Sequence, residues 1–144
     1  MRLLDLFCGA GGAAKGYYDA GFDEITGVDN RPQPRYPYRF VLGDALEYVA
    51  AHGREFDAIH ASPPCQGYSA LLCLPWLRGR VYPKLIAPLK PLLQATGRPW
   101  VAGLSSVVSA SDCPCTDIVS LNRPRSSWGL LTSNIVWSLV TAEC

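Results

Sequence analysis

The sequence predicts an α/β fold in which a parallel-rich sheet is flanked by helices. Short apolar runs alternate with segments of helical spacing, which is the pattern of strands joined by crossover helices. A length of 144 residues fits one domain, and 49% hydrophobic with 17% charged residues is typical of a globular protein. No internal repeat is present.

Each expected element follows from its residues. Apolar runs that end at glycines, acids or prolines predict strands at 2–9, 24–30, 39–42, 55–61 and 98–104. Helical spacing predicts helices at 12–22, 45–53 and 82–97. Between two strands, segment 31–40 carries three prolines, so we expect it to be extended or looped. Pro88 and Pro91 are expected to kink the last helix or delay its start.

The regular pattern ends near Val101. Residues 102–144 are rich in serine and have no clear helical period, although runs at 117–121 and 135–140 resemble strands. We therefore expect a first unit at 1–101 and a diverged segment at 102–144, made of extra strands or a poorly ordered tail. The fold is expected to be incomplete at its C-terminus.

Charge is unevenly distributed along the chain. Nine of the twelve acids precede Ala58, and no Asp or Glu occurs from Ala58 through Ser111. That acid-free stretch contains five basic residues, Arg78, Arg80, Lys84, Lys90 and Arg98. It predicts either a positive surface for a nucleic acid or an ordinary solvated face.

Six cysteines occur without a signal-peptide pattern, and no apolar run is long enough for a membrane span. We expect a cytoplasmic protein with reduced thiols and no membrane association. Cys113 and Cys115 lie one residue apart, a weak zinc signal without a second ligand pair, so no metal site is predicted.

The residues after the first three expected strands suggest a ligand site. Glycines at 9, 11 and 12 allow a ligand to approach the backbone at a helix N-terminus. Asp29, about 20 residues later, stands where nucleotide folds hold a ribose hydroxyl, and Asp44 adds a carboxylate after the next strand. The alternative is that both acids cap following helices.

Cys65 follows two prolines and precedes Gln66. Prolines stiffen the chain before the thiol, which favours a cysteine aimed at a substrate over a buried structural cysteine. Cys8, in the glycine loop, is expected to be a small apolar filler.

The runs DLFCGAGG, GVDN, GDA and SPPCQGYS, in this order, resemble the N-terminal half of DNA (cytosine-5)-methyltransferases, the compact bacteriophage type above all. The resemblance covers roughly residues 1–101. It implies a Rossmann-like S-adenosylmethionine-dependent methyltransferase fold that acts on a flipped cytosine in DNA, as in restriction-modification, in the cytoplasm of a bacterial or phage-infected cell.

The resemblance also implies roles for individual residues. Cys65 would be the catalytic nucleophile, with Gln66 and Ser69 in the substrate loop. The residues implied to bind S-adenosylmethionine are Phe7, Gly9, Gly11, Asp29 for the ribose, Asn30 and Asp44 for the adenine, and Pro64.

The sequence departs from the family after Trp100. Gly103 and Leu104 stand where the family has a glutamate-asparagine pair, and the next glutamate is Glu143. General acid assistance contributes on the order of 10²–10⁴-fold in rate, so turnover is expected to be slow. Three alternatives follow: a catalytically impaired cofactor-binding module, acting as a decoy or with a partner chain; a reading-frame change near codon 101; and, more remotely, a nicotinamide-dependent oxidoreductase.

Overall fold

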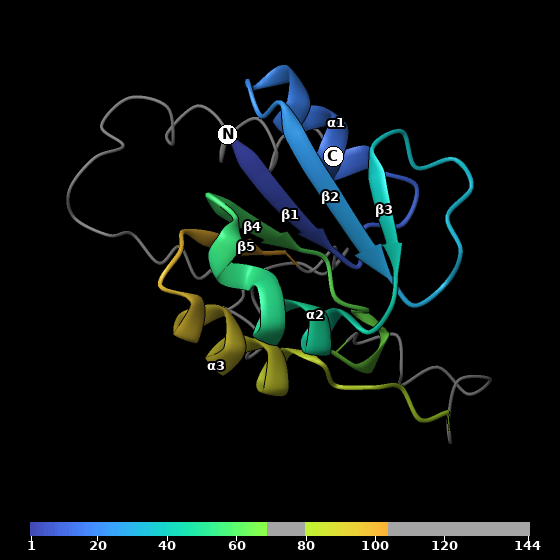
Figure 1. Cartoon of the computed structure of the whole chain (residues 1–144). Helices are drawn as coiled ribbons and strands as arrows, with labels where there is room; N and C mark the ends of the chain where they lie inside the picture. The colour runs from blue at the N-terminus through green and yellow to red at the C-terminus, as the bar shows by residue number, and fades with distance from the viewer. Residues whose placement is uncertain (69–79, 104–144) are drawn as a thin grey trace, which may run out of the picture.

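Five parallel strands form one sheet in the order β3-β2-β1-β4-β5 (Figure 1). The computed structural model describes residues 1–68 and 80–103. The strands are β1 (Arg2–Leu6), β2 (Glu24–Asp29), β3 (Arg39–Leu42), β4 (Ala58–Ala61) and β5 (Trp100–Ala102). The helices are α1 (Gly12–Asp19), α2 (Ala45–His52) and α3 (Ile86–Thr96), with 3₁₀ turns η1 (Gly53–Glu55) and η2 (Gln66–Tyr68). The predicted α/β class with a parallel sheet is confirmed, and residues 104–144 lie outside the described ranges.

Helices cover both faces of the sheet, because side chains alternate along each strand. Leu4 and Leu6 of β1 face α2 and α3, which lie side by side on one face (Figure 1). Leu3 of β1 faces the other way, toward α1, and belongs to the same buried cluster as Tyr17 of that helix. Each face has its own apolar cluster, and the site residues lie at the ends of strands held between the two clusters.

The β2–β3 connection contains no helix, as its prolines predict. A parallel pair is usually joined by a helix that covers the sheet. Here the ring of Tyr36, buried among the residues packed on α1, covers β2 instead. Gly27 makes this possible, because a Cβ at that position would lie 2.3 Å from Tyr36 Cζ.

Helix α3 starts four residues later than the first residue of the expected segment 82–97. The delay agrees with the prediction from its prolines: Pro88 lies in the first turn, where backbone N–H groups have no helical partner. Pro91 lies inside the helix, and Leu89 and Leu93 are buried against the sheet. Helix α1 ends at Asp19, two residues before Gly21, whose φ of 101° lies in the left-handed region.

Within residues 1–68 and 80–103, no helix is both long and apolar enough to cross a membrane. The same described ranges contain no group of three or more His, Cys, Asp or Glu residues placed to hold a metal ion. Cys113 and Cys115 lie outside them.

Candidate active site at the carboxyl edge of the sheet

The candidate site lies where β1, β2 and β4 end. Leu6, the last residue of β1, pairs with Val28 of β2 on one side and with Ala61 of β4 on the other. The chain leaves β1 toward β2, whereas β4 lies on the opposite side, so the strand order reverses between β1 and β4. Ligands of open α/β sheets bind at such a point.

The loop after β1 has a left-handed backbone at three positions. Phe7 has a φ of 57°, which is uncommon for a residue with a side chain, and Gly9 and Gly11 have φ values of 49° and 90°. A Cβ at Gly9 would meet nothing within 4 Å, so this backbone is open to a ligand. A Cβ at Gly11 would lie 2.9 Å from Pro37 Cδ, so this glycine is required by packing against the proline-rich connection.

Asp29 joins two loops of this edge. Its Oδ2 accepts a hydrogen bond from the backbone N–H of Gly9 at 3.1 Å, and its Oδ1 accepts one from the backbone N–H of Arg31 at 3.0 Å. No helix follows β2, so the helix-cap alternative for Asp29 is wrong. A carboxylate has about four acceptor positions, so Asp29 keeps capacity for a ligand hydroxyl. Asn30 beside it is exposed.

Asp44 caps α2. Its Oδ1 accepts hydrogen bonds from the backbone N–H groups of Leu46 at 2.7 Å and Glu47 at 3.0 Å. The helix-cap alternative is therefore correct for this residue. Both cap bonds use one oxygen, and within the described part of the chain Oδ2 has no hydrogen-bond partner. The residue is exposed, so its second oxygen is available to a ligand.

The cysteine loop leaves β4 beside the glycine loop. Ser62 N–H donates to the Leu6 carbonyl at 3.0 Å, which extends the β1–β4 pairing by one residue. Pro63 is buried, and Pro64 and Cys65 are half-buried. Gln66 is exposed and begins η2. Ser69, the other residue expected in this loop, lies outside the described residues.

The two described thiols differ in their surroundings. Cys8 is buried among the residues that pack on α1, which confirms that it fills apolar space. Burial raises the pKa of Cys8 to about 12, and the nearby carboxylates of Asp5 and Asp29 add to the shift. Cys65 is half-buried and free. Between these two thiols, the more accessible one is the predicted nucleophile.

A buried polar cluster that the sequence did not predict lies behind this loop. Asp5 of β1 accepts from His60 Nδ1 on β4 at 2.9 Å and from the Tyr36 hydroxyl at 3.2 Å. His60 Nε2 lies 3.5 Å from Ser62 Oγ. The sequence feature that could have indicated this cluster is the presence of Asp5 and His60 within otherwise apolar strands.

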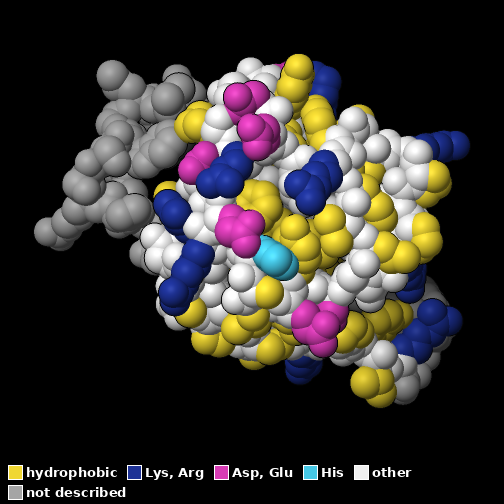
Figure 2. Space-filling model, in the orientation of Figure 1, with side chains coloured by type: hydrophobic (Ala, Val, Ile, Leu, Met, Phe, Trp, Pro, Cys, Tyr) yellow, Lys and Arg dark blue, Asp and Glu magenta, His cyan; other side chains and the backbone are white. Residues whose placement is uncertain are grey.

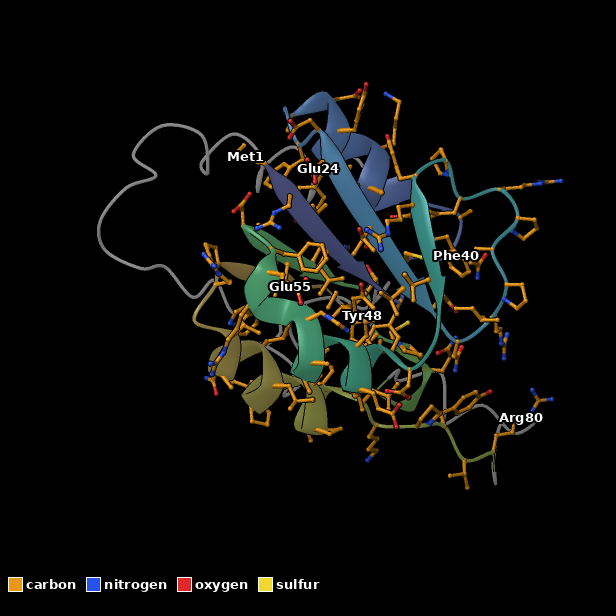
Figure 3. The ribbon with its side chains drawn as sticks, in the orientation of Figure 1. Met1, Glu24, Phe40, Tyr48, Glu55 and Arg80 are labelled. Carbon is orange, nitrogen blue, oxygen red and sulfur yellow. The ribbon has the colours of Figure 1, made fainter. Side chains whose placement is uncertain are left out.

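The basic residues of the acid-free stretch are exposed where they are described. Arg80, Lys84, Lys90 and Arg98 are all exposed, and Arg80 projects outward ahead of α3 (Figure 3). On the face drawn in Figure 2, the basic and acidic side chains of the described residues are interspersed. Both alternatives for the acid-free stretch stay predictions. Arg78 lies outside the described ranges.

The sequence of this chain is similar to that of known proteins. The family described as C-5 cytosine-specific DNA methylase matches residues 1–71, which include the glycine loop, both acids and Cys65. Residues 1–71 of this chain are therefore similar to the DNA cytosine-5 methyltransferase family. The type II methyltransferase M.XorII of Xanthomonas oryzae is 35% identical over 83 residues, 47% of this chain and 20% of that protein. M.HgiGI of Herpetosiphon aurantiacus is 32% identical over 82 residues, 49% of this chain and 64% of that protein.

The matched region spans less than two thirds of either methyltransferase relative. Among solved structures, a mutant of Spodoptera frugiperda DNMT2 aligns with a TM-score of 0.53 at 18% identity, covering 72% of this chain and 35% of that chain. This likeness concerns the fold alone. It confirms the Rossmann-like fold expected from the sequence.

Proposed function

We propose that this chain binds S-adenosylmethionine at the carboxyl edge of the sheet and uses Cys65 as the nucleophile that methylates carbon 5 of cytosine in DNA. The observation that carries the proposal is the adjacency of two loops. The glycine loop and the cysteine loop leave the paired ends of β1 and β4, at Leu6 and Ala61. A cofactor and a thiol held there would lie side by side at one edge of the sheet.

The edge residues fit S-adenosylmethionine. The open backbone at Gly9 suits close approach of a ligand, and Asp29 beside it retains acceptor capacity for ribose hydroxyls. Asp44 Oδ2 suits a donor such as the adenine amino group. Phe7, Gly11, Asn30 and Pro64 belong to the same loops and complete the proposed cofactor site. When bound, S-adenosylmethionine supplies an electrophilic methyl group.

The role of Cys65 follows from cytosine chemistry. Carbon 5 is a weak nucleophile until a thiolate forms a bond to carbon 6, which moves ring electrons to carbon 5. After carbon 5 is methylated, its proton leaves and the Cys65–carbon 6 bond breaks, which returns the thiolate and the aromatic ring. Carbon 6 lies inside the duplex stack, so the base must be flipped out first. The stiff Pro63–Pro64 approach suits this task, because near-attack geometry controls the rate.

A second candidate function rests on Gly103. This residue stands where the family has the glutamate of a glutamate-asparagine pair, and its N–H donates to the Ala61 carbonyl at 3.0 Å, beside the cysteine loop. A glycine offers no side chain to protonate the cytosine ring. The second candidate is therefore a cofactor-binding module with impaired chemistry, alone or with a partner chain. The proposed site of action, with DNA as partner, is the cytoplasm of a bacterial or phage-infected cell.

Covalent trapping tests the first candidate against the second. The full chain and S-adenosylmethionine are mixed with mixed-sequence duplex DNA containing 5-fluorocytosine. Fluorine at carbon 5 takes the place of the proton whose loss would release the enzyme from the base. We expect a denaturation-resistant adduct that Cys65→Ser abolishes and that cytosine DNA does not give. No adduct, with S-adenosylmethionine binding intact by calorimetry, would refute the first candidate and support the second.

A competition experiment addresses the cofactor itself. Saturating NAD should leave S-adenosylmethionine affinity unchanged, and Asp44→Asn should weaken it. Displacement by NAD at micromolar concentration would instead favour the oxidoreductase alternative.

A further inference from the structure

A hydrogen-bonded chain of three side chains runs from the centre of the sheet to the cysteine loop. Asp5 is 1% exposed and His60 is 7% exposed, and they face each other across β1 and β4 in register. His60 Nδ1 lies 2.9 Å from Asp5 Oδ1, and His60 Nε2 lies 3.5 Å from Ser62 Oγ. Ser62 is exposed and is the last residue before the two prolines.

The neighbouring residues are arranged around this chain. Gly27 is the register partner of Asp5 on β2, and its missing side chain lets the Tyr36 ring cross the strand. The Tyr36 hydroxyl then donates to Asp5 Oδ2 at 3.2 Å. Both carboxylate oxygens of Asp5 are therefore hydrogen-bonded, as a buried carboxylate requires. Apolar side chains in place of Asp5 and His60 would pack in the core without needing these hydrogen bonds.

The hydrogen bonds define the tautomer of His60. Asp5 Oδ1 can only accept from His60, so the proton lies on Nδ1. In the neutral ring Nε2 is an acceptor, so the Ser62 hydroxyl can donate to it. The 3.5 Å separation is long for a hydrogen bond. It is suited to orienting Ser62 and not to proton transfer.

Ser62 is the last anchor before the nucleophile. Its N–H donates to the Leu6 carbonyl at 3.0 Å and its hydroxyl faces His60. Pro63 and Pro64 have no N–H, so they donate no backbone hydrogen bond between Ser62 and Cys65. Stiff prolines transmit the orientation of Ser62 along the short path to the thiol.

We infer that Asp5, His60 and Ser62 are positioning residues that fix the cysteine loop in its reactive orientation through this hydrogen-bonded chain. The inference rests on the proposed function of Cys65 and deepens it. None of the three is proposed to touch the substrate. Tyr36 completes the support by holding the second oxygen of Asp5.

The test compares Ser62→Ala with Ser62→Thr in the full chain. Ser62 is exposed, so both variants are expected to fold. The rate of adduct formation with 5-fluorocytosine DNA, at saturating DNA and S-adenosylmethionine, should fall about tenfold or more in Ser62→Ala, because small misplacements of reacting groups cost up to about 10²-fold. Cofactor affinity should stay within about twofold, and Ser62→Thr should restore most of the rate.

Asp57→Asn is the matched control. Asp57 lies at the opposite end of the same strand pair, where its Oδ2 accepts a hydrogen bond from the Arg2 N–H at 2.7 Å. The Asp57→Asn variant should therefore form the adduct at the wild-type rate. An unchanged rate in Ser62→Ala overturns the inference, and so does an equal loss of rate in Asp57→Asn.

A second readout does not depend on activity. In ¹⁵N spectra, His60 should show a protonated Nδ1 and an acceptor Nε2, and Ser62→Ala should shift both the Nε2 signal and the Cys65 backbone amide. If the wild type forms no adduct, the nucleophile proposal fails, and the spectra alone decide the inference. If no adduct forms, a Cys65 amide signal that is identical in wild type and Ser62→Ala overturns the positioning inference.

Discussion

Replacing Gly27 by alanine should be strongly destabilising, although it adds one methyl group to a strand. The new Cβ would lie 2.3 Å from Tyr36 Cζ and 2.5 Å from its hydroxyl oxygen, so the ring must move. Overpacking of this kind costs about 1–3 kcal/mol. The displaced Tyr36 also loses its hydrogen bond to the Asp5 carboxylate, which is worth about 1.5–3 kcal/mol. Together we expect Gly27→Ala to lower the free energy of unfolding by about 2.5–6 kcal/mol.

Urea unfolding followed by circular dichroism measures this loss. The double variant Gly27→Ala/Tyr36→Val should cost less than the sum of its single variants, by about 1–3 kcal/mol, because the smaller side chain removes the clash. Gly12→Ala is the control, since a Cβ there would meet nothing within 4 Å and its change should stay below about 1 kcal/mol. A loss below about 1 kcal/mol in Gly27→Ala, or additive single effects, would refute the reasoning.

Three further predictions concern the edge of the sheet and the buried groups behind it. In the native protein at pH 8, iodoacetamide should modify Cys65 and spare Cys8, whose pKa is raised to about 12; peptide mass spectrometry locates the label. Asp44→Ala should lose about 1 kcal/mol of stability with the α2 cap and also weaken S-adenosylmethionine binding, whereas Asp44→Asn should keep the cap and weaken binding about tenfold. Stability should fall as the pH rises from 9.0 toward 12, because Cys8 ionises in the unfolded chain while burial keeps it protonated in the folded one.

Each of these has a contrary outcome. Labelling of Cys8 at the same rate as Cys65 would mean that the glycine loop opens in solution. Equal cofactor affinity in Asp44→Asn and wild type would remove Asp44 from the proposed site. In the alkaline series, measured by urea midpoints, Cys8→Ala should show a shallower decline than the wild type, and an identical decline would contradict the assignment.

Much of the fold could be predicted because its elements carry local signals. The apolar run of β1 stops at a glycine loop, Asp44 marks the start of α2, and the prolines of α3 delay its first turn. These signals also located Cys65 and the glycine loop. Their roles, and a domain boundary near residue 101, stay predictions.

The buried cluster could not be predicted in the same way, because it is made by register. Asp5 and His60 are 55 positions apart, and only the pairing of β1 with β4 brings them together. Tyr36 comes from a proline-rich loop without periodicity, and its place depends on the absence of a side chain at Gly27. For Asp29 the sequence suggested a cap or a ligand contact, but its hydrogen bonds to two loops required the three-dimensional arrangement.

The position of β1 at the centre of the sheet bears on how the chain assembles during synthesis. Both of its partners follow it in the sequence, β2 closely and β4 only from Ala58 onward. Until β4 emerges from the ribosome, β1 has one unpaired edge, and until α3 emerges Leu4 and Leu6 lack one of the two helices that bury them. Non-local parallel pairing is slow, and exposed strand edges favour aggregation. A nascent chain halted before β4 should therefore depend on chaperones, while one that includes α3 should not.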